Sequence, residues 1–482
     1  MKMLLRAGLI ASVVALSGAG RAQAQYTNLH SFSGGVSDGA SPYYGSLAPS
    51  GSTLYGMAYG AGASGLGVVF AMQTDGSGYT NLHSFAGGAS DGARPGGSLT
   101  LSGTNLCGMA SQGGAGGLGV VFAMNADGSG YTNLHNFAGG AGDGAQPNGS
   151  LTLSGSTLYG MTFLGGASGL GVIFAMNTDG SGYTNLHSFA GGAGDGAGPY
   201  GSAMLSGSTL YGMATAGGAS NNGVVFAMNT NGSGYTNLHA FVGGASDGAV
   251  PYFGPLTLSN STLYGMTTAG GAGNNGVVFA MQTDGSGYTN LHRFAGGASD
   301  GACPYGSLTR AGSTLYGTAS RGGAGNLGVV FAMRSDGSGY TNLHNFAGGA
   351  SDGVRPGGSP ALSGTTLYGM TPFGGASGLG VVFALPSGLQ TLTVTTPYGA
   401  ATPAAGTYTN DYGTELTNVV ISPDVRGTTQ YVCTGWMGTG SVTNGTGTNT
   451  SFSITAHSAL AWLWKTQYLT TASAGADGTI AP

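Results

Sequence analysis

The chain has 482 residues, of which only 6% are charged, and its formal net charge is −5. It contains no Lys/Arg-rich run, which excludes the basic footprint of a nucleic-acid-binding protein, so no nucleic acid is expected as a partner. Gly supplies 101 residues, but the glycines recur at fixed places between apolar runs. The composition therefore indicates a repeated folded unit rather than disorder.

Residues 1–24 have the pattern of a secretory signal peptide. Lys2 and Arg6 give a basic start, residues 9–16 are apolar, and residues 22–24 read Ala-Gln-Ala, a small-x-small cleavage pattern. The alternative is an uncleaved anchor, but the apolar run is shorter than the about 20 residues that span a bilayer. We therefore expect an exported protein, secreted or at the cell surface, with no transmembrane segment after cleavage.

A pentapeptide, Tyr-Thr-Asn-Leu-His, occurs seven times at intervals of 52 or 53 residues. A fixed period of this size indicates one structural unit repeated along the chain. The seven copies end at His30, His83, His135, His187, His239, His292 and His344.

Within the first unit the sequence predicts four strands, over residues 26–32, 45–48, 53–57 and 67–72. Asp-Gly and Ser-Gly turns separate them, which is typical of an antiparallel meander. The fourth segment is apolar on both faces and must therefore be covered on both faces. A ring of four-stranded sheets satisfies this requirement.

The order of the segments predicts that the ring closes. The chain begins with an outermost strand, and the last repeat ends after its third strand. Residues 26–32 are therefore expected to complete the sheet of residues 356–386 and to remove an open edge. The sequence thus predicts an all-β protein, with a seven-bladed β-propeller over residues 25–387. An open solenoid is the alternative, but it would require capping repeats.

One family resemblance rests on the whole unit. Leu-His-Ser-Phe, Gly-Gly, Asp-Gly-Ala-x-Pro, Leu-Tyr-Gly-Met, Gly-Gly-Ala and Gly-Val-Val-Phe follow one another, with small departures, in all seven repeats, over residues 26–386. This order resembles the GloVer (Gloeo-Verruco) tandem repeat of exported bacterial proteins. The resemblance implies no defined catalytic activity, and in that family such repeats often precede a surface-anchoring segment.

The composition changes after residue 387. Residues 388–468 are rich in Thr and predict a small β-rich module, which resembles a divergent internalin-type B-repeat module. Residues 469–482 repeat the start of this module, so we interpret them as the beginning of a second, truncated copy.

Histidine and aspartate recur together in the repeat. Each pentapeptide His stands eight residues before an Asp, and a His–Asp hydrogen bond fixes the tautomer of an imidazole. Because a catalytic site needs one constellation rather than seven equal ones, we interpret the pairs as structural ties between an outer strand and the next blade. The seven aspartates are Asp38, Asp91, Asp143, Asp195, Asp247, Asp300 and Asp352.

No catalytic residues are predicted. Every propeller carboxylate belongs to one of two repeated Asp-Gly turn slots, and the one Glu of the chain, Glu415, lies in the tail. No unique pair of acids is available for general acid and base roles. Each turn offers one carboxylate where calcium needs six to eight oxygen ligands. We therefore expect a non-enzymatic protein with neither a metal nor a cofactor.

The loops that differ among the repeats are the candidate binding region. In a four-stranded blade, the loop after the Asp-Gly turn and the loop before Gly-Gly-Ala lie on the same face, and loops on a rigid scaffold carry function. Their aromatic residues are the candidates: Tyr43, Tyr44, Tyr59, Phe163, Tyr200, Tyr252, Phe253, Tyr305 and Phe373.

Three functions remain open from the sequence. The first is a monomeric binding scaffold for a glycan or an extracellular protein. The second is a polysaccharide-active enzyme on a propeller scaffold, and the third is a structural spacer without a ligand. The fold class alone does not choose among them.

Overall fold

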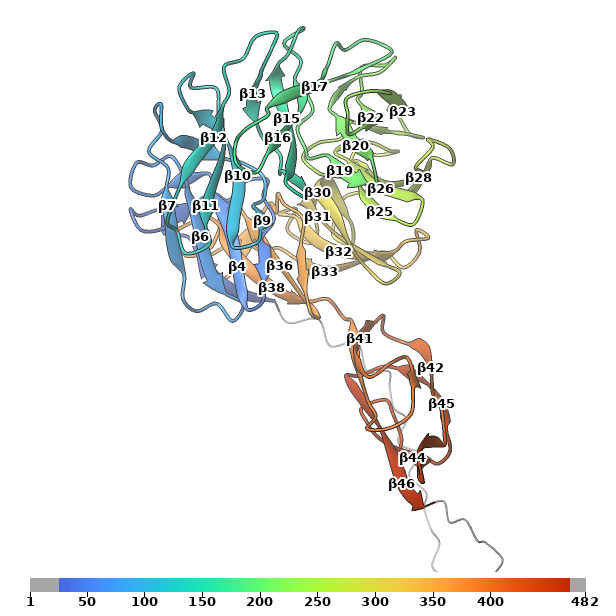
Figure 1. The fold of residues 1–482 in the computed structure, drawn as a ribbon. Coiled ribbons are helices and arrows are strands. Elements are labelled where there is room, and N and C mark those ends of the chain that lie inside the picture. Colours follow the sequence, from blue (N-terminus) through green and yellow to red (C-terminus); the bar gives the residue numbers. More distant parts are fainter. Residues whose placement is uncertain (1–25, 469–482) are drawn as a thin grey trace, which may run out of the picture.

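A computed structural model describes residues 26–468, which form strands, turns and loops without a helix. Figure 1 shows sheets arranged around a central axis, as in a β-propeller, and a separate C-terminal β module. The predicted signal peptide and the predicted second module copy lie outside the described residues. No helix that could cross a membrane occurs in residues 26–468.

Each repeat supplies antiparallel strands to a sheet ordered from the axis outward, as in β3-β4-β6-β7. The innermost strands are β3 (Ala48–Ser50), β9 (Thr100–Ser102), β14 (Thr152–Ser154), β19 (Met204–Ser206), β25 (Thr257–Ser259), β30 (Gly301–Ala311) and β35 (Ala361–Ser363). The second strands are β4 (Thr53–Ala58), β10 (Asn105–Gly113), β15 (Thr157–Gly165), β20 (Thr209–Ala214), β26 (Thr262–Thr267), β31 (Thr314–Gly322) and β36 (Thr366–Thr371). The third strands are β6 (Val68–Gln73), β11 (Val120–Asn125), β16 (Val172–Asn177), β22 (Val224–Asn229), β28 (Val277–Gln282), β32 (Val329–Arg334) and β38 (Val381–Pro386). The outer strands are β7 (Thr80–Ser84), β12 (Thr132–Asn136), β17 (Thr184–Ser188), β23 (Thr236–Ala240), β29 (Thr289–Arg293), β33 (Thr341–Asn345) and β1 (Thr27–Ser31).

At one end of every sheet, the loop that enters the inner strand pairs with the loop that leaves the second strand. Four of these pairs are separate two-stranded ladders: β2 (Gly39–Ala40) with β5 (Gly60–Ala61), β18 (Gly196–Ala197) with β21 (Ala216–Gly217), β24 (Gly248–Ala249) with β27 (Ala269–Gly270), and β34 (Gly353–Val354) with β37 (Phe373–Gly374). In the other three sheets β8 (Gly92–Pro95), β13 (Gly144–Pro147) and β30 itself pair with the extended second strand. Both variable loop sets therefore lie on the same face, as predicted.

The third strand is buried on both faces because its side chains alternate between two neighbouring sheets. Val68, Phe70 and Met72 face one core cluster, whereas Val69 faces the next. The same alternation builds a cluster at each contact between consecutive sheets. One cluster joins the first and last repeats, because Phe70 shares it with Met370 and Val382.

The N-terminal strand completes the last sheet, so that prediction is confirmed. β1 pairs antiparallel with β38, with Thr27 opposite Ala384 and Ser31 opposite Val381. The order β1-β38-β36-β35 gives this sheet its fourth strand from the opposite end of the repeat region.

One of the four predicted segments, the one that corresponds to the innermost strand, was predicted in the wrong position. Residues 45–48 were expected to be extended, but β3 spans Ala48–Ser50. The reason lies at Gly45, where an added Cβ would come within 2.2 Å of the Gly97 carbonyl oxygen. Glycine at this position allows the backbones of neighbouring repeats to come into contact at the axis, and the strand begins after it.

These axial glycines follow one another round the molecule. A Cβ on Gly97 would lie 2.3 Å from the Gly149 carbonyl oxygen, and one on Gly358 would lie 2.1 Å from that of Gly45. Only glycine fits such contacts without a shift of the backbone. The last repeat thus meets the first at the axis as closely as consecutive repeats meet each other.

The C-terminal module has its own core, which Leu392, Ile454, Leu460 and Trp462 help to form. The module contains a five-stranded sheet, β41-β39-β46-β44-β43, and a three-stranded sheet, β40-β42-β45. Their bounds are β39 (Gln390–Thr395), β40 (Ala401–Thr402), β41 (Gly406–Asn410), β42 (Thr414–Val420), β43 (Asp424–Arg426), β44 (Thr429–Thr439), β45 (Asn449–Ile454) and β46 (Ser458–Tyr468).

Candidate binding face and the joints beneath it

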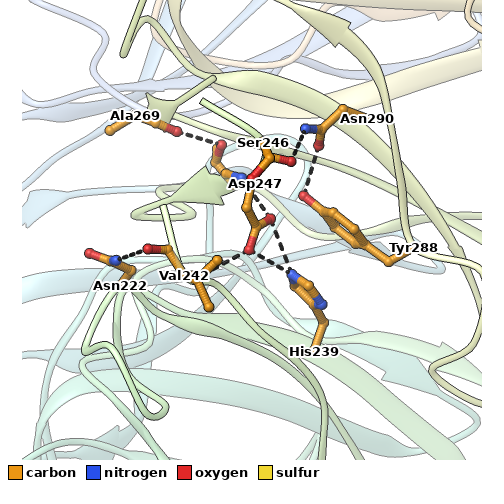
Figure 2. A network of polar contacts seen from close by, with 10 residues as sticks. Asn222, His239, Val242, Ser246, Asp247, Ala269, Tyr288 and Asn290 are labelled. Atoms are coloured by element: carbon orange, nitrogen blue, oxygen red, sulfur yellow. Dashed lines mark hydrogen bonds and ion pairs between the residues drawn. The ribbon is translucent and has the colours of Figure 1, made fainter. Parts of the chain in front are cut away.

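Each predicted His–Asp pair is in contact, and each contact lies where one sheet meets the next. The Nε2–Oδ1 distances are 3.0–3.2 Å in all seven pairs. Because a carboxylate only accepts hydrogen bonds, Nε2 carries the proton. Figure 2 shows one pair, in which Asp247 also accepts a hydrogen bond from the Val242 N–H at 2.8 Å.

The aspartate is the centre of each joint. Asp247 Oδ1 accepts the N–H of Gly248 at 2.7 Å, so its two oxygens receive His239 and two backbone donors. Burial raises the pKa of Asp247, but the hydrogen bonds from His239 and Val242 outweigh this effect and leave that pKa below its usual value. The carboxylate is therefore held charged and is fully used within the joint.

Sequence reasoning missed the third member of each joint, the Tyr that opens the next pentapeptide. Tyr288 stacks on His239 with ring centroids 3.8 Å apart, and its hydroxyl donates to Asn290. The same stacking occurs at all seven pentapeptide histidines, with centroids 3.8–4.1 Å apart. At the closing joint, Tyr26 stacks on His344. The sequence did carry a signal for this role, since the Tyr is as constant among the repeats as the His.

The nine candidate aromatic residues come together in one continuous cluster, which we call the aromatic face. Neighbouring rings have centroids 3.7–6.5 Å apart, and the chain of contacts runs from Phe163 through Tyr200 and Tyr44 to Phe373. Eight of the rings are half-buried and offer free surface. Phe253 is only 6% exposed, so it packs beneath its neighbours rather than presenting a face to a ligand.

Two repeats are one residue longer than the others, and their extra residues meet. The 53-residue units contain Tyr44 and Phe253 directly before an axial glycine, where the 52-residue units have no counterpart. The two rings stack 3.7 Å apart at an interplanar angle of 6°. Both residues have a left-handed backbone, with φ of 64° and 66°, a conformation that is unusual for bulky side chains.

This stacked pair lines a small cavity at the axis. The cavity has a volume of about 100 Å³, and the serines that follow the axial glycines line it together with Tyr44 and Phe253. Ser46, Ser98 and Ser150 each donate a backbone N–H to the serine hydroxyl of the next repeat, at 2.6–2.8 Å. The spacing of 53 rather than 52 residues was the sequence signal for this pair.

Two pockets open on either side of Tyr43 and Tyr44. One, of about 370 Å³, is lined by these two residues with Cys303, Tyr305, Ser320, Arg321, Arg355, Gly357, Pro372 and Phe373. The other, of about 340 Å³, is lined by the same two tyrosines with Tyr59, Ser111, Gln112, Gln146, Asn148 and Tyr200. Both volumes fall in the range of small-ligand sites, about 300–1,000 Å³.

A strained position before the loop proline supplies some of these lining residues. Arg94, Gln146, Val250, Cys303 and Arg355 all have φ between 52° and 58° and precede a proline. The preceding repeat fixes this conformation, since the Arg355 N–H donates to the Leu327 carbonyl at 2.7 Å. Sequence reasoning missed this slot because side chains rarely adopt that backbone region.

The opposite ends of the strands, which we call the turn face, vary little among the repeats. In the Asp-Gly-Ser-Gly turns, the Asp Oδ1 accepts the N–H and the hydroxyl of the Ser two residues on, as Asp179 does from Ser181 at 2.9 and 2.7 Å. The C-terminal module contacts the turn face. Asp411 accepts hydrogen bonds from Ser313 and from the Thr314 hydroxyl, the latter at 2.7 Å.

The sequence profile of the Gloeobacter/Verrucomicrobia repeat matches residues 16–155 and 140–327, and the chain belongs to this family. The match confirms the resemblance that the repeat unit indicated. It does not reach the C-terminal module. No curated protein matches this chain in sequence.

Several solved structures share part of the arrangement at low sequence identity. An ancestral GH74 enzyme is 13% identical over 73% of this chain and 48% of its own, with a TM-score of 0.49. An oligogalacturonate lyase from Vibrio parahaemolyticus is 10% identical over 76% of this chain and 94% of its own, with a TM-score of 0.46. TolB from Acinetobacter baumannii is 14% identical over 57% of this chain, with a TM-score of 0.36, and this chain covers 59% of its length.

Proposed function

We propose that this protein is an exported, non-enzymatic and monomeric scaffold that binds a glycan through its aromatic face. The observation that carries the proposal is the cluster of aromatic rings with a pocket on either side of Tyr43 and Tyr44. Rings that are half-exposed on a rigid scaffold offer flat apolar surfaces, which suit the C–H faces of sugar rings. Gln112, Gln146 and Asn148 line the second pocket and supply the donors and acceptors that sugar hydroxyls require.

We further propose that the repeats form one closed, seven-bladed propeller. Three observations support closure: the pairing of β1 with β38, the core shared by the first and last repeats, and the stacking of Tyr26 on His344. Closure matters for function because the first pocket takes Tyr43 from the first repeat and Arg355 from the last.

The non-enzymatic part of the proposal rests on how the titratable groups are used. The histidines of the repeat and the seven aspartates paired with them are used in equivalent joints, where each Asp accepts from its His and from the backbone. The pockets are lined instead by aromatic, amide, hydroxyl and guanidinium groups, with one thiol. Such a lining suits recognition rather than acid–base chemistry.

The C-terminal module fits a role in display. It contacts the turn face, so the aromatic face lies at the other end of the propeller strands. We propose that the module is a divergent internalin-type surface module. It would then hold the propeller with its binding face directed away from the cell.

A glycan array tests the proposed function. The wild-type protein should bind a limited set of glycans, and Tyr43→Ala combined with Tyr252→Ala should abolish that binding. Tyr468→Ala is the matched control, because this tyrosine is 76% exposed at the end of β46. An array without signal would favour a spacer, binding only to proteins would replace the glycan as partner, and turnover of a polysaccharide would show an enzyme.

A further inference from the structure

The larger pocket of the aromatic face is built from three parts of the ring closure. The loop of the first repeat supplies Tyr43 and Tyr44, β30 and β31 supply Tyr305 and Arg321, and the last repeat supplies Arg355 and Phe373. Its lining therefore combines flat aromatic surfaces with two cations. This combination sets it apart from the second pocket, whose lining carries no charged side chain.

The two arginines are notable because cations are scarce in the propeller. Residues 26–387 contain six arginines and no lysine. Arg94 is engaged at the same face, where its Nη1 donates to the Tyr59 carbonyl and its guanidinium lies 5.0 Å from the Tyr59 ring. Among the described residues, the side chains of Arg321 and Arg355 have neither an ion pair nor a hydrogen bond.

The pocket lining offers these guanidinium groups no carboxylate. Each arginine lies close to a tyrosine hydroxyl of the same pocket. Burial raises the pKa of Tyr43, and the charge of Arg355 offsets part of that rise; Arg321 acts in the same way on Tyr305. Both guanidinium groups therefore line the pocket while remaining exposed to solvent.

The main chain at both arginines is fixed by pairing with neighbouring segments. Arg321 lies in β31 next to Gly322, which pairs with Gly301, and Ala302 is its partner across the ladder. Arg355 follows Val354, which pairs with Phe373, and its own N–H is bonded to Leu327. Binding through these two residues therefore requires no ordering of the main chain, only of the two side chains.

We propose that this pocket binds the carboxylate of an acidic sugar, a uronic acid residue within a polysaccharide. This inference rests on the proposed function and names its ligand class. The guanidinium groups of Arg321 and Arg355 donate to the carboxylate, because a planar guanidinium matches a carboxylate with two parallel hydrogen bonds. The sugar ring packs against Tyr43, Tyr305 and Phe373, which form the apolar walls.

The test compares one polyuronate with its own carboxyl-reduced form, so that the two polymers differ only in having a carboxylate or a neutral hydroxymethyl group at that position. Binding is measured by isothermal titration calorimetry with alginate or polygalacturonate. The wild-type protein should bind the acidic polymer at least about tenfold more tightly than the reduced one. Arg321→Gln with Arg355→Gln should remove this preference. Arg310→Gln with Arg334→Gln makes the same change of charge on exposed arginines at the turn face, and it should retain the preference.

A second readout places the ligand in the pocket. Cys303 lines it and is half-buried, whereas Cys107 and Cys433 are buried. Alkylation of Cys303 by iodoacetamide should therefore be slowed by the polyuronate and not by its reduced form. Variants are compared only after their thermal unfolding matches that of the wild type.

Three outcomes would overturn the inference. Equal binding of the acidic and the reduced polymer that Tyr43→Ala with Tyr252→Ala abolishes would refute the acidic ligand and leave the proposed glycan scaffold standing. A preference that tracks sulfate groups rather than carboxylates would assign the two arginines to another anion. Failure to bind any polysaccharide would overturn both proposals.

Discussion

The two ends of the propeller strands differ in what their loops contact. At the turn face, the Asp of an Asp-Gly-Ser-Gly turn bonds to the Ser of the same turn, as Asp75 does with Ser77. At the aromatic face, side chains contact other repeats, as Tyr44 does with Phe253. A loop whose hydrogen bonds are made within itself varies little among the repeats, whereas a loop that meets its counterparts round the axis has diversified. Variation among the repeats therefore marks the face where loops of different repeats contact each other.

The largest expected effect separates an axial glycine from a turn glycine. Gly149→Ala would place a Cβ 2.0 Å from the Gly201 carbonyl oxygen, so it should lower the free energy of unfolding by about 3 kcal/mol or more. Gly155→Ala, in a turn with φ of 57° and no atom within 4 Å, should cost about 1 kcal/mol. Urea unfolding of both variants measures the difference. Equal costs would show that the repeats do not approach each other closely at the axis.

The next effect contrasts the two kinds of repeated aspartate. Asp195→Ala removes the acceptor of His187 and of the N–H groups of Ala190 and Gly196, so it should destabilise the protein by about 3 kcal/mol. Asp179→Ala changes an exposed turn and should have only a small effect. Thermal unfolding of both variants measures this contrast. His187→Ala, which disrupts the same joint from its other side, should also destabilise the protein. A larger loss at Asp179 would contradict the structural role of the joints.

The joints also predict acid lability. Asp143, Asp195 and Asp247 have pKa values below the usual value of about 3.9, because hydrogen bonds from the His and the backbone outweigh burial. The unfolded state therefore binds more protons in this range, so stability should be constant above about pH 5 and should fall as the pH drops through 4. Unfolding in urea between pH 7 and 2.5 measures this slope. Asp195→Asn should flatten it, and a stability that rises on acidification would contradict the account.

The smallest effect concerns the strained slot before the loop proline. Val250 has a φ of 55°, which is costly for a β-branched residue, and Gly198 occupies the same slot of another repeat. Val250→Gly should therefore stabilise the protein, by about 1 kcal/mol. Val242→Gly, at a valine that is 59% exposed and outside this slot, is the control and should destabilise slightly. A stabilising effect of both would remove backbone strain as the cause.

Much of the fold could be predicted because the repeat unit occurs seven times in the sequence. The outer strand, the doubly buried third strand and the closure by residues 26–32 follow from periodicity and from which strand comes first. The inner strand was misplaced because glycine at its start serves a contact between repeats, which no local propensity records.

The sequence predicted which face of the propeller carries the candidate site, but it did not predict which residues meet there. The sequence placed Tyr44 and Phe253 on the same face, yet their stacking depends on how the sheets are arranged round the axis. The cationic side of the larger pocket was missed for a similar reason. Arg321 and Arg355 stand in different repeats, and the left-handed backbone at Arg355 is one that propensity argues against.

Amide hydrogen exchange of the N-terminal strand tests closure most directly. β1, β7 and β17 have the same sequence, Thr-Asn-Leu-His-Ser, so their intrinsic exchange rates match, and the residues that follow them distinguish their peptides. If β1 fills the last sheet, its amides should be protected as strongly as those of β7 and β17. Exchange of β1 at the rate of an unstructured terminus, with β7 and β17 protected, would contradict the closed ring and the pocket that its two ends share.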